Sequence, residues 1–138
     1  MKEITLKEWS AYLPYGLICE VKDQGEIKTD TLSGIYDNKE LVFHNIVESH
    51  QGFESVKPIL YDLSWLTREI EFGGEKFIPN HDPLFKYFIP YELEEFKNSI
   101  PYSLSFEQYE KLLEWKFNVF NLPDELIVRA SEDFNPYK

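Results

Sequence analysis

Hydrophobic and polar positions alternate along much of the N-terminal half of the chain, and this period of two predicts β-strands. A strand is expected at 17–23, and two more within 26–47 on either side of a turn at 37–40, which Asp37 and Asn38 suit. A further strand is predicted over 55–63, where Pro58 indicates the edge of a sheet or the start of the strand.

Turn and capping residues mark the ends of the other N-terminal elements. Thr5 and Glu8 have the spacing of a capping box, so we expect a short helix that ends at Pro14 and Gly16. Gly73–Gly74 separates two short runs with strand character, and a glycine pair at that place is typical of a two-residue hairpin. We predict positive φ at one or both of these glycines.

The C-terminal part has helical patterns instead. The segment 82–100 is helical in composition, and Pro90 should break or kink it. A second capping box, at Ser105 and Gln108, predicts a helix that continues through Phe120. Asn121 and Pro123 would then end this helix.

The two patterns together predict an α+β fold. A small antiparallel, β-rich half at 1–79 would pack against C-terminal helices at 80–138, in a single domain that spans 1–138. The segment 124–130 could be a last helical turn or a short strand. A chain of this length can bury a core without covalent staples, and its single cysteine, Cys19, excludes an internal disulfide.

The predicted C-terminal helix is apolar around more than half of its surface. On a helical wheel the apolar arc covers roughly 200°, about twice the minimum for a helix with one buried side. Its members are Phe106, Tyr109, Leu112, Leu113, Trp115, Phe117, Val119 and Phe120. The β-rich half, the helical segment 82–97, a partner protein or a second copy in a homodimer could cover this arc. We favour burial within the chain, because monomers rarely expose large apolar patches.

One lysine, Lys116, falls inside that apolar arc. In the interpretation that we favour, its methylenes lie on apolar surface and its ammonium reaches water. In the alternative, a partly buried ammonium pairs with a carboxylate or with an anionic group of a ligand.

The charge balance limits the classes of partner. The chain has 25 acidic against 14 basic residues, a net charge of −11, so we expect no direct binding to a nucleic-acid backbone. The same excess leaves open an acidic mimic of nucleic acid. The N-terminal sequence MKEITLKEWS has no apolar segment of the kind that a signal peptide needs, and no apolar run is long enough for a membrane span. We therefore expect a soluble protein of the cytoplasm with no membrane association.

Motifs for catalysis, metals and cofactors are weak or missing from the sequence. There is no P-loop and no dinucleotide fingerprint. His44, Glu48 and His50 could hold a metal, but surface histidines explain them more simply. Glu69 and Glu71 would share one strand face, where paired carboxylates can serve acid–base chemistry, although a solvent-facing edge is the commoner meaning. We therefore predict no catalytic residue, no metal and no cofactor.

Three stretches of the chain resemble one group of proteins. They are YLPYGL at Tyr12–Leu17, the run from Lys57 to Pro79, and LLEWKFNVFNLP near the C-terminus. In these stretches the chain is similar to small uncharacterised proteins encoded by phages and prophages of Bacteroides-type gut bacteria. That group typically has LLEWHFDVFGLI at the third stretch, so Lys116 stands where it has histidine, and asparagine replaces Asp and Gly at 118 and 121. The resemblance implies a context and no assigned chemistry.

The resemblance and the composition together predict a non-enzymatic phage or prophage accessory protein. It would bind and modulate a host protein or sequester a small ligand, with a counter-defence role as one form of this activity. An enzyme with an unrecognised site is the alternative. The residues that we predict for ligand or partner binding are Trp65, Arg68, Tyr109, Trp115 and Lys116.

Overall fold

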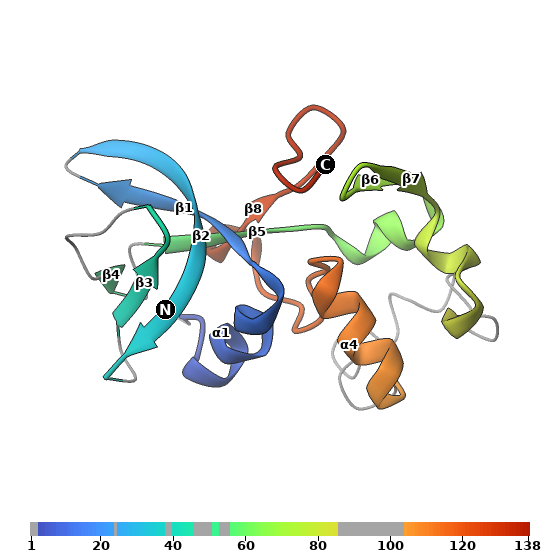
Figure 1. Cartoon of the computed structure of the whole chain (residues 1–138), viewed down its shortest axis with the longest axis horizontal. Coiled ribbons are helices and arrows are strands. Elements are labelled where there is room, and N and C mark those ends of the chain that lie inside the picture. Colours follow the sequence, from blue (N-terminus) through green and yellow to red (C-terminus); the bar gives the residue numbers. More distant parts are fainter. Residues whose placement is uncertain (1–2, 24, 38–39, 46–50, 53–55, 86–103) are drawn as a thin grey trace. The chain divides into compact units, whose positions relative to one another are not determined.

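The computed structural model describes residues 3–23, 25–37, 40–45, 51–52, 56–85 and 104–138. The chain forms two compact units, of which the first comprises Met1–Ile59 with Leu122–Val128 and the second Leu60–Asn121 with Arg129–Lys138. The elements confirm the α+β class, with strands predominating in the N-terminal half (Figure 1). The units divide at positions other than 79, and the single domain stays a prediction.

The first unit opens with the helix α1 (Leu6–Tyr12), which begins at the predicted capping box. The Thr5 hydroxyl oxygen accepts a hydrogen bond from the Glu8 amide at 3.3 Å. The Glu8 carboxylate in turn accepts one from the Thr5 amide at 2.9 Å. A 3₁₀ turn, η1 (Leu13–Tyr15), follows and ends at Gly16, whose φ of 70° suits a residue without a side chain.

A mostly antiparallel sheet forms most of the first unit (Figure 1). Its strands are β1 (Ile18–Asp23), β2 (Glu26–Tyr36), β3 (Glu40–Phe43), β4 (Gln51–Gly52), β5 (Val56–Leu60) and β8 (Val128–Arg129), in the spatial order β4-β3-β2-β1-β5-β8. Along β1, Cys19 and Val21 are completely buried while Lys22 is exposed, as the alternating pattern predicted. The segment 124–130 contains both predicted alternatives, a 3₁₀ turn η7 (Asp124–Leu126) followed by β8.

Pro58 lies in the middle of β5, which has a neighbour on each side in the sheet. The prediction of an edge strand or a strand start was therefore wrong. The neighbour β8 is only two residues long, and Ala130 donates its amide to the carbonyl of Leu60 at 2.9 Å. A proline is tolerated because this short pairing is made at the end of β5, away from the missing amide of Pro58.

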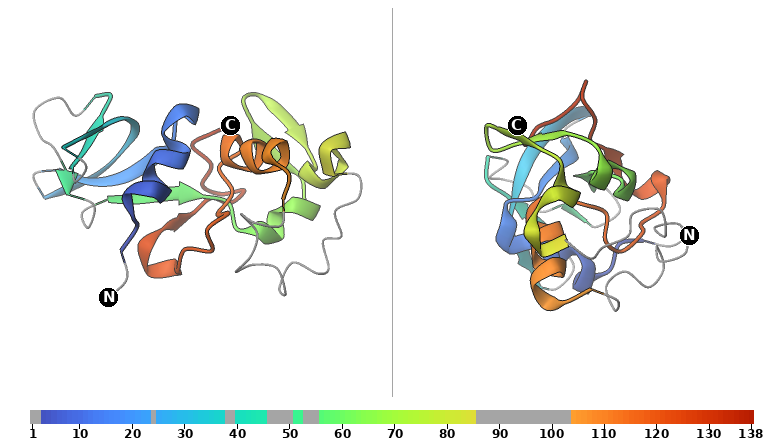
Figure 2. Two further views of the ribbon diagram at one scale, coloured as in Figure 1. Left: turned by 90° about the horizontal axis from the view of Figure 1, so that it is seen from below. Right: turned by 90° about the vertical axis from the view of Figure 1, so that its right-hand side faces the viewer.

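The second unit contains short elements. They are the 3₁₀ turns η3 (Leu63–Thr67), η4 (Pro79–His81) and η5 (Pro83–Phe85), the strands β6 (Ile70–Phe72) and β7 (Glu75–Phe77), and the helix α4 (Phe106–Glu114). Figure 2 shows α4 as a short helix followed by an irregular segment. Most of the predicted helical segment 82–100, including Pro90, lies outside the described residues.

The predicted hairpin is confirmed at Gly73–Gly74. The two glycines connect β6 to β7 and have φ of 60° and 85°. Phe72 pairs with Glu75 directly across the turn, so the loop has two residues. An added side chain would meet nothing within 4 Å at either glycine, so only the backbone conformation requires glycine here.

Replacing both Gly73 and Gly74 with valine is expected to lower the free energy of unfolding by about 2 kcal/mol, because a β-branched residue is strained at positive φ. Chemical denaturation of the purified variant measures this loss. Gly73→Asn is the matched control, since asparagine tolerates the left-handed conformation and should cost little. An unchanged stability in the double valine variant would contradict the hairpin.

The helix α4 begins where predicted and ends six residues early. The Ser105 hydroxyl oxygen accepts from the Gln108 amide at 3.2 Å, and the Gln108 side chain accepts from the Ser105 amide at 3.1 Å. The helix ends at Glu114 instead of Phe120, because Lys116 adopts the left-handed conformation with φ of 65°. The prediction of a helix through Phe120 was therefore wrong.

Two backbone hydrogen bonds close this helix end. Lys116 donates its amide to the carbonyl of Leu113 at 3.0 Å, and Phe117 donates to that of Leu112 at 2.9 Å. This pair of bonds defines a Schellman motif, in which glycine is the usual left-handed residue. A lysine occupies that place here, so the sequence did not show the helix end.

Candidate functional site

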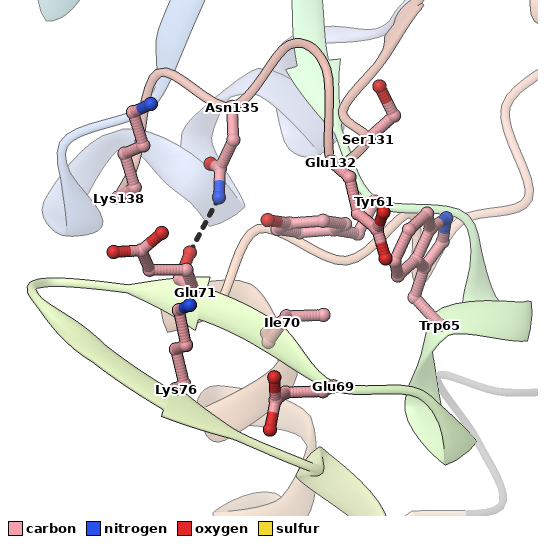
Figure 3. Close-up of a pocket in the computed structure, with 10 residues that line it drawn as sticks. All are labelled: Tyr61, Trp65, Glu69, Ile70, Glu71, Lys76, Ser131, Glu132, Asn135 and Lys138. Atoms are coloured by element: carbon pink, nitrogen blue, oxygen red, sulfur yellow. Dashed lines mark hydrogen bonds between the residues drawn. The ribbon is translucent and has the colours of Figure 1, made fainter.

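A pocket of about 360 Å³ lies within the second unit (Figure 3). It is lined by Tyr61, Trp65, Glu69, Ile70, Glu71, Lys76, Ser131, Glu132, Asn135 and Lys138. These residues come from the end of β5, the turn η3, the β6–β7 hairpin and the C-terminal segment. The volume is in the range that a small ligand or one side chain of a partner can fill.

Tyr61 forms the inner wall of this pocket. Its backbone is fixed by two hydrogen bonds, from the Tyr61 amide to the Lys116 carbonyl at 2.8 Å and from the Asn118 amide to the Tyr61 carbonyl at 2.9 Å. Its ring lies 5.6 Å from the ring of Phe117 and 5.8 Å from that of Trp65, measured between centroids. These two ring contacts restrict the orientation of the phenol.

Trp65 provides the more accessible aromatic surface. It lies on η3, whose first turn is capped by the Asp62 carboxylate accepting from the Ser64 amide at 3.1 Å. The guanidinium carbon of Arg68 lies 3.8 Å from the centroid of the Trp65 ring, which is the distance of a cation–π contact. Arg68 does not line the pocket itself, although it touches the ring that does.

The C-terminal segment forms the opposite wall and is tied to the hairpin by hydrogen bonds. Asn135 donates its side-chain amide to the Glu71 carbonyl at 2.6 Å, and its side-chain oxygen accepts from the Tyr137 amide at 3.0 Å. Gly73 donates its amide to the Tyr137 carbonyl at 2.9 Å. The pocket is thus built from segments that are far apart in the sequence and fixed by main-chain contacts.

The charges of the pocket are unevenly distributed. Lys76 stands opposite Glu71 in the register of the β6–β7 pair. In the view of Figure 3, Lys76 and Lys138 are drawn on the same side as Glu71, and Glu132 is drawn on the other side, toward Trp65. Burial raises the pKa of the Tyr61 hydroxyl to about 12, the Glu71 carboxylate adds to this shift, and a hydrogen bond with Asn135 opposes it. The phenol is therefore neutral at pH 7.

The environment of Lys116 corrects the sequence interpretation. Its side chain is only 1% exposed, so the ammonium does not reach water as predicted. The nitrogen lies 4.9 Å from the ring centroid of Phe72 and 5.2 Å from that of Tyr137, and it donates a hydrogen bond to the Glu114 carbonyl. The reason is the left-handed backbone, which turns the side chain into the unit instead of along a helix face.

Burial lowers the pKa of Lys116 to about 8, against an opposing effect of the Glu114 carboxylate. That carboxylate forms its ion pair with Lys111 at 3.1 Å. Within the described ranges no carboxylate forms an ion pair with Lys116, whose charge is instead placed between two aromatic rings and a carbonyl. The alternative of a carboxylate partner thus finds no support in this part of the chain, and a ligand anion stays a prediction.

The other two predicted site residues lie away from this pocket. Trp115 is buried and packs on Phe77 and Phe85, with ring centroids 5.1 and 5.9 Å away. It also lines a second, wider pocket of about 500 Å³. Tyr109 meets Phe120 edge to face at 6.3 Å. The structure therefore brings Trp65 and Arg68 into contact and places Lys116 outside the lining of the first pocket. Trp115 lines the second pocket, and Tyr109 packs against Phe120.

Sequence reasoning missed the residues that complete the first pocket. Tyr61 and Asn135 carried no motif, and Glu69 and Glu71 were interpreted as a solvent-facing strand edge. Both glutamates do line the pocket, although Glu69 is exposed and precedes β6. The spacing of aromatic and charged residues in WLTRE at 65–69 was the one local signal that could have indicated a binding surface.

The remaining sequence hypotheses concern metals and membranes. His44 is exposed, while Glu48 and His50 lie outside the described residues. In the ranges that the structure describes, no group of three or more His, Cys, Asp or Glu side chains is arranged to hold a metal ion. Likewise, none of the helices described here has the length and apolar character required to cross a bilayer.

Comparisons with protein-family models, with curated proteins and with solved structures found no match.

Proposed function

We propose that this chain is a non-enzymatic accessory protein of phage or prophage origin, which acts by binding a host protein or a small ligand in the pocket beside Trp65. The resemblance of YLPYGL, the 57–79 run and the C-terminal LLEWKFNVFNLP supports the origin. The pocket supports the binding activity, because it combines a fixed aromatic wall with several polar groups at its rim.

The observation that carries this proposal is the fixed geometry of the pocket. Backbone hydrogen bonds with the Lys116 carbonyl and the Asn118 amide hold Tyr61, and those of Asn135 hold the C-terminal wall. A site whose walls are already in place loses little conformational entropy on binding, which favours affinity. Half-buried Trp65 has the residue type that most often dominates binding energy at interfaces.

Two of the titratable groups in the pocket, Tyr61 and Glu71, are poorly placed for acid–base catalysis. Tyr61 has a pKa of about 12, too high for a general base near neutral pH, and Glu71 is placed against Lys76. Binding is therefore the function that this arrangement of groups supports best.

Removing the indole by Trp65→Ala is expected to abolish specific capture. The wild-type chain and each variant serve as bait in lysates of Bacteroides-type cells, and native mass spectrometry examines the same preparations for co-purified small molecules. Loss of a central tryptophan costs about 2 kcal/mol or more, which is roughly a thirtyfold loss of affinity. Capture of a host protein would support the host-protein form of the proposal. A co-purified small molecule would support sequestration.

Phe106→Ala is the matched control, because Phe106 is 73% exposed on α4 and does not line the pocket. The Phe106→Ala variant should capture the same proteins or small molecules as the wild-type chain. Melting curves show whether the Trp65→Ala variant is folded. Identical capture by a folded Trp65→Ala variant and by the wild-type chain would contradict binding at this pocket.

A further inference from the structure

We infer that Lys116 is a positioning residue of the pocket beside Trp65, because its buried ammonium holds two walls of that pocket together. The hairpin wall is made by β6 and β7, and the C-terminal wall by residues 131–138. This inference rests on the proposed function, since it names a residue that sets the shape of the same site. Lys116 does not line the pocket, so it acts through the residues that form the walls.

The backbone of Lys116 supports the inner wall of the pocket. Its carbonyl accepts a hydrogen bond from the Tyr61 amide at 2.8 Å, and its amide donates to the Leu113 carbonyl at 3.0 Å. Lys116 therefore joins the end of α4 to the residue that forms the inner wall. Its φ of 65° is costly for a residue with a side chain, and such a conformation persists only where the surrounding contacts fix it.

The side chain of Lys116 contacts the other two walls. Its nitrogen lies 4.9 Å from the ring centroid of Phe72 and 5.2 Å from that of Tyr137, within the range of cation–π contacts. Phe72 directly follows Glu71, which lines the pocket from the hairpin. Tyr137 lies two residues after Asn135, which lines it from the C-terminal segment. One ammonium thus attracts a ring from each wall.

The burial of this charge strengthens that attraction. The Lys116 side chain is 1% exposed, and although burial lowers its pKa to about 8, the amine is mostly protonated at pH 7. Exclusion of water makes a buried ammonium costly, but it also increases the attraction between the cation and the ring faces. The nitrogen is anchored by its hydrogen bond to the Glu114 carbonyl. A methionine would fill much of the same space and attract the two rings less strongly.

Hydrogen exchange of single amides, followed by NMR at pH 7, tests the inference. The Gly73 amide donates to the Tyr137 carbonyl at 2.9 Å, so its exchange reports separation of the two walls. The Leu32 amide, which donates to the Leu17 carbonyl in the first unit, is the reference. Relative to Leu32, we expect Gly73 to exchange about fivefold faster in Lys116→Met than in the wild type. An unchanged or smaller ratio would overturn the inference.

The comparison separates positioning from a general effect on stability. Lys116→Met is expected to be at least as stable overall as the wild type, so faster exchange at Gly73 would run against the change in global stability. Lys116→Gln also lacks the charge and provides the same measurement if Lys116→Met does not fold. Faster exchange of Gly73 and Leu32 by one common factor would show global destabilisation and overturn the positioning role.

Lys111→Met is the matched control for the loss of a lysine charge. The Lys111 nitrogen lies 5.4 Å from the ring centroid of Trp115, so this variant also removes a cation placed over an aromatic ring. Lys111 does not line the first pocket. The Gly73 amide should therefore exchange at the wild-type rate in Lys111→Met. Equal acceleration in the two methionine variants would overturn the assignment to Lys116.

A double-mutant cycle tests whether the ammonium acts through the ring of the C-terminal wall. In a Tyr137→Leu background only the Phe72 contact remains, so Lys116→Met should accelerate exchange at Gly73 about twofold instead of fivefold. The same factor in both backgrounds would show that the ammonium and the Tyr137 ring do not act together, and it would overturn the inference.

Capture from lysates distinguishes this inference from the proposed function. A protein or small molecule retained through Trp65 should bind Lys116→Met about fivefold more weakly than the wild type. Undiminished capture by Lys116→Met would overturn the positioning role. If Gly73 exchange responds as expected while the wild-type chain captures nothing, the proposed function fails and the joining of the walls by Lys116 stands.

Discussion

Replacing Lys116 with methionine is expected to leave the fold at least as stable at pH 7, and the advantage of methionine over lysine should shrink as the pH rises from 8 to above 10.5. Methionine matches the length of the lysine stem and removes the buried charge. The backbone strain is equal in the two proteins, because both residues carry a side chain at the same φ of 65°.

The direction of this expected pH dependence follows from the lowered pKa of Lys116. Its folded-state pKa is about 8 against an ordinary value of 10.5, so between these values the unfolded chain binds more protons than the folded one. The free energy of unfolding of the wild-type chain therefore rises with pH across this window and is flat for this group outside it. The shift corresponds to roughly 3 kcal/mol. Below pH 8, where the lysine is charged in both states, the free energy of unfolding is lower by this amount than it is above pH 10.5.

Denaturation of both proteins at several pH values from 7 to 11 measures this difference, and groups common to both cancel in the comparison. Lys57→Met removes an equal charge from an exposed position on β5 and is the matched control. Parallel stability curves for the wild type and Lys116→Met would contradict the buried charge. A loss of roughly 3–5 kcal/mol at pH 7 would indicate that the ammonium neutralises a buried carboxylate after all.

Local signals in the sequence located the starts of elements in this fold. The capping boxes at Thr5 and Ser105 are confirmed, because each depends on side chains within three residues of one another. The turn at Gly73–Gly74 is likewise confirmed, since positive φ strongly selects glycine. These features require no knowledge of the rest of the chain.

The end of α4 could not be predicted in the same way. Lysine is a good helix former and carries no signal for the left-handed conformation that Lys116 adopts. The competing interaction is the pairing of Lys116 and Asn118 with Tyr61, which lies more than fifty residues earlier. Tertiary hydrogen bonds of this kind override local helix propensity.

The candidate site shows the same limit. Trp65 and Arg68 were predicted as binding residues, and the structure places them in contact, Trp65 on the turn η3 and Arg68 directly after it. Asn135 gained its role only by reaching the Glu71 carbonyl, 64 residues away in the sequence. A pocket assembled from four segments leaves no motif in any of them, so its polar lining could be found only in three dimensions.

Shortening Phe117 to alanine is expected to cost about 3–5 kcal/mol of unfolding free energy, whereas Phe106→Ala should change it by no more than about 0.5 kcal/mol. Phe117 is completely buried and stacks against Tyr61 at 5.6 Å, while Phe106 is 73% exposed at the first turn of α4. A single helix over 105–120 would place both rings in one apolar arc and give them comparable costs. The two variants therefore measure where the helix ends.

Chemical denaturation of the two alanine variants gives this comparison directly. Phe117→Leu is a milder substitution that should keep the fold and still lose roughly 1–2 kcal/mol, so it serves where Phe117→Ala is too unstable to purify. The larger loss at Phe117 follows because its removal leaves a cavity beside Tyr61, the inner wall of the pocket. Equal losses of stability at Phe106 and Phe117 would favour an uninterrupted helix over 105–120. They would also contradict the packing of Phe117 against Tyr61.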